Sequence, residues 1–282
     1  MAFRDPATPI IHLSFDGGGT GMFAQLSGCI QAAEIAERFG KRPVMRLMSA
    51  NYRESGADPE WFGAFFANKG EAQLPHDQPA TVMCDGSDLP TKASYTTRQQ
   101  AKDLFDRHFA VRPEFLDEID AWASANAIGP NTLAIHYRGT DKHTEAPTQR
   151  IDDVLQRVAR YVDTLEEVQN IFVASDEAAF VEQACRGVAG LDVVALDDSS
   201  RSAGDAPLHL QKLHVGNRAM GRDALLNCLM LAQCGWLCRT SSFLSAWSAI
   251  FNPEIKIAML NEPYGHTTWL PESIILPLAD RI

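Results

Sequence analysis

The stretch Leu133-Ala-Ile-His-Tyr-Arg-Gly-Thr-Asp-Lys-His-Thr-Glu-Ala146 joins a short apolar strand to a loop that is dense in polar side chains. A turn after a buried strand needs only turn-forming and capping residues, and Gly139, Thr140 and Asp141 meet that need. The loop has more charged side chains than such a turn needs. We therefore predict that this loop binds an anion and carries an acid or base beside it.

The charged side chains of this loop are suited to different tasks. Arg138 can bind a diphosphate through two parallel hydrogen bonds, and Lys142 can neutralise a leaving phosphate. Glu145 is the candidate general base, because a carboxylate carries no proton near neutral pH. The structural alternatives are that Arg138 pairs with Asp141 and that Glu145 caps the next helix.

Strand and helix patterns alternate outward from this loop, which indicates a parallel sheet with helices on both faces. The spacing of apolar residues predicts strands over 9–15, 42–48, 132–137, 170–174, 191–196, 235–239 and 255–259. It predicts helices over 22–39, 98–109, 113–126, 150–165, 177–186, 220–233 and 242–251. The expected fold is α/β, with two Rossmann-like doubly wound domains over 1–128 and 129–282. We expect the last residues to pack back on the first domain.

The segment between residues 50 and 130 is the least regular part of the chain. Trp61, Phe62, Phe65 and Phe66 stand there at helical spacing, and we interpret them as core or interdomain packing. A platform for a sugar is the alternative. We expect this region to determine acceptor specificity.

Composition excludes several classes of protein. The chain has 282 residues, a formal net charge of -11 and 45% hydrophobic residues, which argues for a globular protein and against a general nucleic-acid binder. The first nine residues lack a signal-peptide pattern and no segment is long and apolar enough for a membrane span, so we expect a cytoplasmic protein. The cysteines form no C-x-x-C pair, and we expect buried free thiols and no zinc site. They are Cys29, Cys84, Cys185, Cys228, Cys234 and Cys238.

Three further motifs stand at the predicted ends of strands, where ligands bind in open parallel sheets. The glycine-rich turn over 16–25, with Gly19 and Gly21, allows a ligand close to backbone N–H groups at a helix start, or is simply a tight turn. Thr240, Ser241 and Ser242 precede a helix, where backbone donors, hydroxyls and the helix dipole suit a phosphate. A plain helix cap is the alternative there, and capping alone explains Ser175 and Asp176.

Together these segments resemble the GDP-fucose-dependent fucosyltransferases of the α-1,6 group, which includes bacterial nodulation and animal core fucosyltransferases, and more distantly the protein O-fucosyltransferases. The resemblance is carried by residues 136–142, 144–146, 174–177, 198–204 and 239–242, with the N-terminal turn and Gln25. It covers 131–260 well and 1–50 faintly. It implies a GT-B-like fold and an inverting reaction without a metal or other cofactor, in a bacterial cytoplasmic form.

The resemblance also implies a role for each matching residue. His136 and Asn227 would face the guanine, Arg138 and Ser242 the diphosphate, and Lys142 the leaving phosphate. Glu145 would take the proton from the acceptor hydroxyl, and three residues would support the site: Asp141, Asp176 and Gln25.

The chain departs from the α-1,6 group at three points. Gly139 stands where the group has a second arginine, Asn227 stands where an aspartate usually binds the guanine, and one residue fewer separates Lys142 from Glu145. The leading hypothesis is an inverting transferase that moves a sugar, such as fucose from GDP-fucose, to a carbohydrate or other hydroxyl acceptor.

Two alternatives to a transferase remain open from the sequence. One is an NAD(P)-dependent oxidoreductase, because Gly19-x-Gly21-x-x-Ala24 matches the dinucleotide fingerprint, although the acidic residue expected after the second strand is missing. The other is a catalytically inactive relative that binds a nucleotide or a glycan.

Overall fold

The computed structural model describes residues 10–16, 21–48, 52, 60–69, 81–83, 97–139, 146–197, 201, 217–265 and 269–282. Its first half contains a parallel sheet with the strand order β2-β1-β4. The elements of this half are β1 (Ile10–Asp16), α1 (Met22–Arg38), β2 (Arg42–Met48), α2 (Phe62–Phe65), β3 (Phe66–Asn68), β4 (Thr81–Met83), α3 (Arg98–His108), β5 (Phe109–Val111) and α4 (Pro113–Ala125).

The second half contains a six-stranded parallel sheet with the order β11-β10-β9-β6-β7-β8. Its elements are β6 (Thr132–Tyr137), α5 (Ile151–Val162), β7 (Asn170–Ser175), α6 (Ala178–Cys185), β8 (Asp192–Val194), α7 (Asn217–Gln233), β9 (Trp236–Arg239), α8 (Phe243–Phe251), β10 (Lys256–Met259), α9 (Glu272–Ile275) and β11 (Asp280–Arg281). Every helix and strand predicted for this half is present, and the α/β fold class is confirmed.

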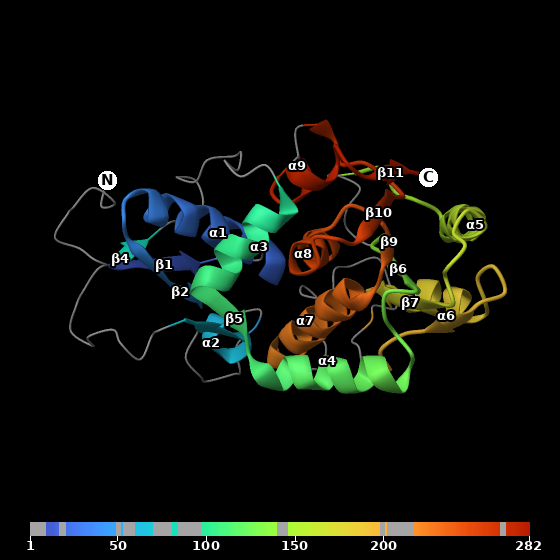
Figure 1. Cartoon of the computed structure of the whole chain (residues 1–282), viewed down its shortest axis with the longest axis horizontal. Helices are drawn as coiled ribbons and strands as arrows, with labels where there is room; N and C mark the ends of the chain where they lie inside the picture. The colour runs from blue at the N-terminus through green and yellow to red at the C-terminus, as the bar shows by residue number, and fades with distance from the viewer. Residues whose placement is uncertain are drawn as a thin grey trace.

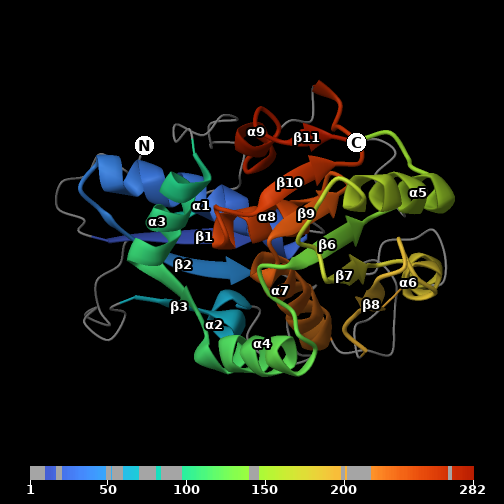
Figure 2. The same cartoon turned by 45° about the vertical axis from the view of Figure 1, so that its right-hand side comes forward.

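Helices cover both faces of the six-stranded sheet, which is why its central strands are apolar on both sides (Figure 2). Leu133 and Ile135 pack with the apolar stripe of α5, formed by Val154, Val158 and Val162, and with α6. Ala134, which alternates with them, faces the other side and joins the cluster that contains α7 and α8. His136 shares the face of Ala134 by the same alternation.

The helices α7 and α8 lie between the two sheets (Figure 1). A single apolar cluster includes residues of α1, α3 and α4 from the first half and of α7 and α8 from the second. The indole N–H of Trp247 on α8 donates a 2.7 Å hydrogen bond to Ser27 on α1, and the Trp247 ring contacts Phe23 and Phe105. The two halves therefore share a core, and the domain division after residue 128 stays a prediction.

The aromatic residues after residue 60 are core residues, as expected, although they do not share one helix. Trp61, Phe62, Phe65 and Phe66 are fully buried. Only Phe62 and Phe65 lie in the short helix α2, because Phe66 begins β3, which pairs antiparallel with β5. The aromatic side chains thus pack against one another and against α3, and their burial leaves no sugar platform there.

The prediction of buried free thiols is confirmed for four of the described cysteines. Cys29, Cys228, Cys234 and Cys238 are free and buried, whereas Cys185 is free and exposed. Cys84 lies outside the described residues. None of the helices that the structure describes is both long and apolar enough to cross a membrane.

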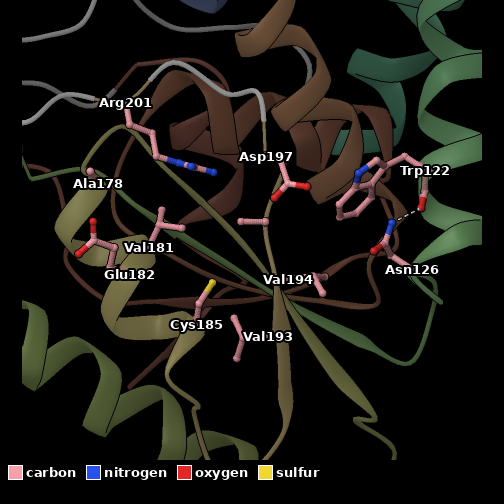
Figure 3. Close-up of a pocket in the computed structure, with 11 residues that line it drawn as sticks. Trp122, Asn126, Ala178, Val181, Glu182, Cys185, Val193, Val194, Asp197 and Arg201 are labelled. Carbon is pink, nitrogen blue, oxygen red and sulfur yellow. Dashed lines mark hydrogen bonds between the residues drawn. The ribbon is translucent and has the colours of Figure 1, made fainter.

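A pocket of about 460 Å³ lies along β8, the edge strand of the six-stranded sheet (Figure 3). Residues of α6, β8 and the end of α4 line it, together with Asp197 and Arg201.

Candidate functional site

The six-stranded sheet has one topological switch point. The chain runs outward from β6 to β7 and β8, then returns to place β9 on the other side of β6 and continues to β10 and β11. Ligands of open parallel sheets bind in the crevice at such a point, outside the carboxyl ends of the strands. The residues after β6 and β9 therefore define the candidate site, and both had been predicted as ligand-binding segments.

Hydrogen bonds fix the segments after β6 and β9 against each other. The Arg138 N–H donates to the Thr240 hydroxyl at 2.9 Å, and the Thr240 N–H donates to the His136 carbonyl at 3.0 Å. The Ser241 N–H donates to Asn261 Oδ1 at 2.7 Å, after β10. These bonds hold the predicted site residues Arg138, Thr240 and Ser241 in one rigid group.

Arg138 is the cation that this group presents at the switch point. Its side chain is 22% exposed, and its Nε lies 3.8 Å from Oδ2 of Asp176, which follows β7. The separation is longer than a normal hydrogen bond, so the pair is an ion pair without tight geometry. Asp176 thus lies where a supporting residue was predicted, and the Arg138 guanidinium keeps access to solvent.

The first half of the chain reaches the same site through the start of α1. The Tyr52 hydroxyl accepts a 2.8 Å hydrogen bond from the Met22 N–H. Burial raises the pKa of Tyr52 to about 12, while this bond and the charge of Arg138 act in the opposite direction. This effect of the Arg138 charge indicates that Tyr52, from the first half, lies in the neighbourhood of this arginine.

Gly21 precedes α1 without an internal reason to be glycine. Its φ is -67°, which any residue adopts, and a Cβ there would only touch the Tyr52 hydroxyl at 3.7 Å. Among the described residues, only this hydroxyl comes within 4 Å of such a Cβ. Gln25, one turn further, is fully buried, and its Oε1 accepts a 3.0 Å bond from the Trp61 indole. Gln25 therefore orients Trp61.

His136 is buried and neutral. Its side chain is 4% exposed, and burial, with smaller effects from Arg239 and Arg138, lowers the pKa of His136 to about 3. Its Nδ1 has no hydrogen-bond partner among the residues that the structure describes. A neutral imidazole offers one hydrogen-bond donor and one acceptor, which suits an uncharged heterocycle such as a nucleobase.

Asn227, the other residue expected to face the guanine, lies on α7. This helix packs on β6 and β7, on the face that carries His136. The Asn227 Nδ2 donates a 2.8 Å bond to the Asp223 carbonyl in its own helix.

Ser242 stands at the N-cap position of α8, yet its hydroxyl makes no capping bond. The residue is 1% exposed, and its Oγ has no hydrogen-bond partner within the described part of the chain. The capping alternative is therefore wrong for Ser242. A buried hydroxyl that serves neither the helix nor a neighbour points to a ligand.

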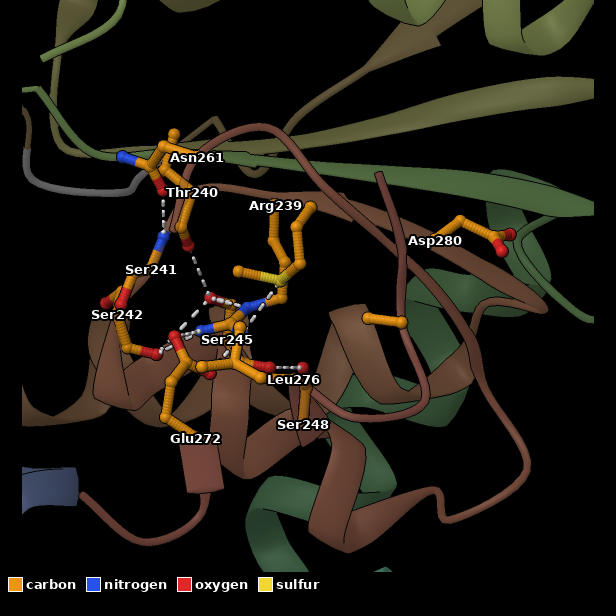
Figure 4. Close-up of polar contacts among 12 residues, drawn as sticks. Arg239, Thr240, Ser241, Ser242, Ser245, Ser248, Asn261, Glu272, Leu276 and Asp280 are labelled. Atoms are coloured by element: carbon orange, nitrogen blue, oxygen red, sulfur yellow. Dashed lines mark hydrogen bonds and ion pairs between the residues drawn. The ribbon is translucent and has the colours of Figure 1, made fainter. Parts of the chain in front are cut away.

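A buried ion pair that the sequence did not reveal supports the start of α8 (Figure 4). Arg239 and Glu272 are both fully buried, with Nη1 to Oε2 at 2.5 Å and Nη2 to Oε1 at 3.1 Å. Arg239 also donates to the Ser245 hydroxyl at 2.9 Å and to the Ser242 carbonyl at 2.8 Å. This arginine has a structural role, since its donors are used within the protein.

The space beside Gly139 is filled by other side chains. A Cβ there would lie 2.2 Å from Oε1 of Glu177 and 2.5 Å from the Tyr137 hydroxyl. Glu177 occupies the N-cap position of α6, and its N–H donates to the Ser175 hydroxyl. The prediction that Ser175 or Asp176 caps this helix is therefore wrong. Glycine at residue 139 is therefore explained by the close approach of the Glu177 and Tyr137 side chains.

Four predicted site residues lie outside the described part of the chain: Gly19, Asp141, Lys142 and Glu145. Their roles stay predictions. Among the described residues, no cluster of three His, Cys, Asp or Glu side chains has the arrangement of a metal site.

Comparisons with known proteins connect this geometry to a fold. No protein-family model and no curated protein sequence matches the chain. Among solved structures, fucosyltransferase NodZ from Bradyrhizobium matches with a TM-score of 0.57 and 17% identity, over 84% of this chain and 92% of that chain. A NodZ α-1,6-fucosyltransferase soaked with GDP-fucose gives 0.59 and 18%, over 86% and 92%. POFUT1 in complex with GDP gives 0.52 and 9%, over 88% and 98%.

The chain has the fold of these fucosyltransferases. The similarity extends over both halves, which confirms the GT-B-like architecture expected from the sequence. In this fucosyltransferase fold, Arg138, Ser241 and Ser242 lie at the switch point of the second sheet. Tyr52, which is bonded to the start of α1, is near enough to Arg138 to be affected by its charge.

Proposed function

We propose that the chain is a glycosyltransferase that moves a sugar from a GDP-sugar, GDP-fucose in the first place, to a hydroxyl group of a glycan or another acceptor. The observation that carries this proposal is the partly exposed Arg138 at the switch point, together with a buried Ser242 hydroxyl that has no hydrogen-bond partner among the described residues. The two fucosyltransferases with the same fold, one soaked with GDP-fucose and one in complex with GDP, support the choice of donor.

The diphosphate of the donor would bind between Arg138 and the start of α8. Arg138 is suited to a bidentate contact with phosphate oxygens, because its planar guanidinium is partly exposed at the switch point. On the other side, the Ser242 hydroxyl can donate a hydrogen bond to a phosphate oxygen. The positive end of the α8 dipole favours the negative charge of the phosphate. Fixed positive charge on a departing diphosphate stabilises the transition state of transfer.

The guanine would face neutral groups. The His136 imidazole remains uncharged at physiological pH, and Asn227 lies on the helix that covers the same face of the sheet. Both side chains can offer a donor and an acceptor. The amide of Asn227 in place of a carboxylate predicts a weaker preference for guanine than an aspartate would give.

Glu145 is the proposed base and Lys142 the proposed partner of the leaving phosphate. Glu145 would remove the proton from the acceptor hydroxyl as that oxygen attacks the anomeric carbon from the side opposite the diphosphate, which inverts the configuration. In this proposal Arg138 and Lys142 balance the charge of the diphosphate, so no metal is required.

A thermal-shift screen and a turnover assay test the function together. We expect GDP and GDP-fucose to raise Tm, with smaller effects from UDP-, ADP- and CMP-sugars, and slow release of fucose from GDP-fucose by the wild type. Glu145→Gln should bind GDP normally and lose turnover, while Glu166→Gln, on an exposed position after α5, should keep both.

Two other outcomes would favour the alternatives to a transferase. Stabilisation by NAD(P) and not by GDP would favour the oxidoreductase alternative. Tight GDP binding without turnover on water or any acceptor would favour the inactive relative.

A further inference from the structure

The pocket beside β8 is separate from the candidate donor site. Its lining includes neither Arg138 nor any residue after β9. Figure 3 shows Trp122 on one side of β8, α6 on the other, and Asp197 and Arg201 near one end. A volume of about 460 Å³ is in the range of small-molecule sites.

One wall of the pocket is a fixed aromatic ring. The indole of Trp122 packs edge-on against Phe172 of β7, with ring centroids 5.8 Å apart and planes at 74°. The Asn126 side chain, which also lines the pocket, donates a 2.9 Å bond to the Trp122 carbonyl. The contact with Phe172 therefore holds the ring, and the Asn126 bond holds the backbone that carries it.

A hydrogen-bond donor without an acceptor lies at the end of the pocket. Arg201 donates from Nη2 to the Leu196 carbonyl at 2.5 Å, which fixes its guanidinium. Its Nε is buried and has no acceptor within the described part of the chain. Because a buried N–H without an acceptor is costly, this atom points to a missing partner.

The charges of the lining select among ligand classes. Glu182 and Asp197 stand against the single cation Arg201, so the lining is acidic overall and disfavours a nucleotide or a free phosphate. A hydrocarbon chain would leave the amide, carboxylates and guanidinium without partners. A neutral pyranose satisfies both features: its C–H face meets the negative face of the indole, and its hydroxyls meet the polar groups.

We propose that this pocket binds a neutral pyranose sugar, with the ring on Trp122 and a hydroxyl oxygen accepting from Arg201. The pocket lies at β8, two strands from β6, a distance of about 10 Å at the usual strand spacing. If the proposed function holds, the sugar is a distant unit of the glycan acceptor, whose reacting hydroxyl lies at the loop after β6. Only this last assignment rests on the proposed function.

Cys185 provides a direct reporter, because it lines the pocket and is exposed, whereas the other described cysteines are buried. The experiment measures the rate of Cys185 alkylation by iodoacetamide, resolved by peptide mass spectrometry. The probes are the methyl glycosides of glucose, galactose, mannose and N-acetylglucosamine at millimolar concentrations. We expect at least one of them to slow the labelling severalfold and saturably.

Variants identify the residues that hold the sugar. Arg201→Gln and Trp122→Ala should abolish the protection, while Trp122→Phe should retain part of it. Arg186→Gln is the matched control, because Arg186 is exposed at the end of α6 and does not line the pocket. Arg201→Gln keeps the test valid if Trp122→Ala fails to fold.

The proposal is overturned if none of the glycosides slows the labelling, if Arg201→Gln leaves the protection intact, or if GDP protects Cys185 as well as a sugar does. GDP binding, measured separately by calorimetry, keeps the two proposals distinct. Normal GDP binding without sugar protection would overturn only the pocket, and sugar protection without GDP binding would overturn only the proposed function.

Discussion

The ends of β6 and β9 lie side by side, and each carries an arginine in a different environment. Arg239 is fully buried and makes two hydrogen bonds with Glu272. Arg138 is partly exposed, and the carboxylate of Asp176 lies 3.8 Å away. The same charge thus serves the structure at one strand end and remains able to contact a ligand at the neighbouring one.

This difference comes from what surrounds each side chain. Arg239 spends its donors on Glu272, Ser245 and the Ser242 carbonyl, and so fixes the start of α8. The backbone N–H of Arg138 donates to the Thr240 hydroxyl and positions the residue, while its side chain, 22% exposed, lies beside Asp176. The buried arginine fixes the start of α8, and the partly exposed one supplies the positive charge of the proposed phosphate site.

The largest expected change in the free energy of unfolding follows from breaking the buried ion pair between Arg239 and Glu272. Arg239→Met should lower the free energy of unfolding by about 3–5 kcal/mol, because it leaves the Glu272 carboxylate buried without a partner. Urea denaturation measures it. The double variant Arg239→Met/Glu272→Leu should recover most of the loss, and a double variant as unstable as the single one would contradict the account.

A smaller effect is expected at the end of β6. Gly139→Ala places a Cβ against Glu177 and the Tyr137 hydroxyl and should cost about 1–3 kcal/mol, as overpacking does. Since the closest atom is the end of a flexible side chain, Glu177→Ala in the same chain should relieve part of this cost. Additive effects of the two substitutions in thermal denaturation would show that the residues do not contact each other.

The third expected effect depends on pH and concerns His136, which faces Arg239 across the β6–β9 pairing. The unfolded chain protonates this imidazole below pH about 6.5, but the folded protein does not until the pH nears the pKa of about 3. Stability from His136 is therefore complete above pH 6.5 and falls by about 1.4 kcal/mol per pH unit below it. His136→Gln should remove this part of the slope in denaturation between pH 6.5 and 5, and equal slopes would contradict it.

Much of the second sheet could be predicted because its elements are long and regular. The strand over 132–137 and the helix with Val154, Val158 and Val162 repeat their apolar residues at the periods of strand and helix. The polar residues that end these strands were predictable as site residues for the same reason, since parallel strands bring their carboxyl ends together.

The remainder depends on contacts between distant residues or on segments too short to show a period. β3 and β5 have three residues each, and their pairing is invisible in the local pattern. Glu272 meets Arg239 only in the folded chain, 33 residues away. Tyr52 near Arg138, and the pocket beside β8, likewise arise from packing between halves or layers.

The most direct test of the central claim is a calorimetric titration of GDP into the wild type and Arg138→Ala, with Arg186→Ala as control. We predict saturable binding to the wild type and the control, and an affinity for Arg138→Ala that is weaker by about tenfold to a hundredfold, as expected for charge-assisted bonds to phosphate. Absence of GDP binding by the wild type, or an unchanged affinity of Arg138→Ala, would contradict the account.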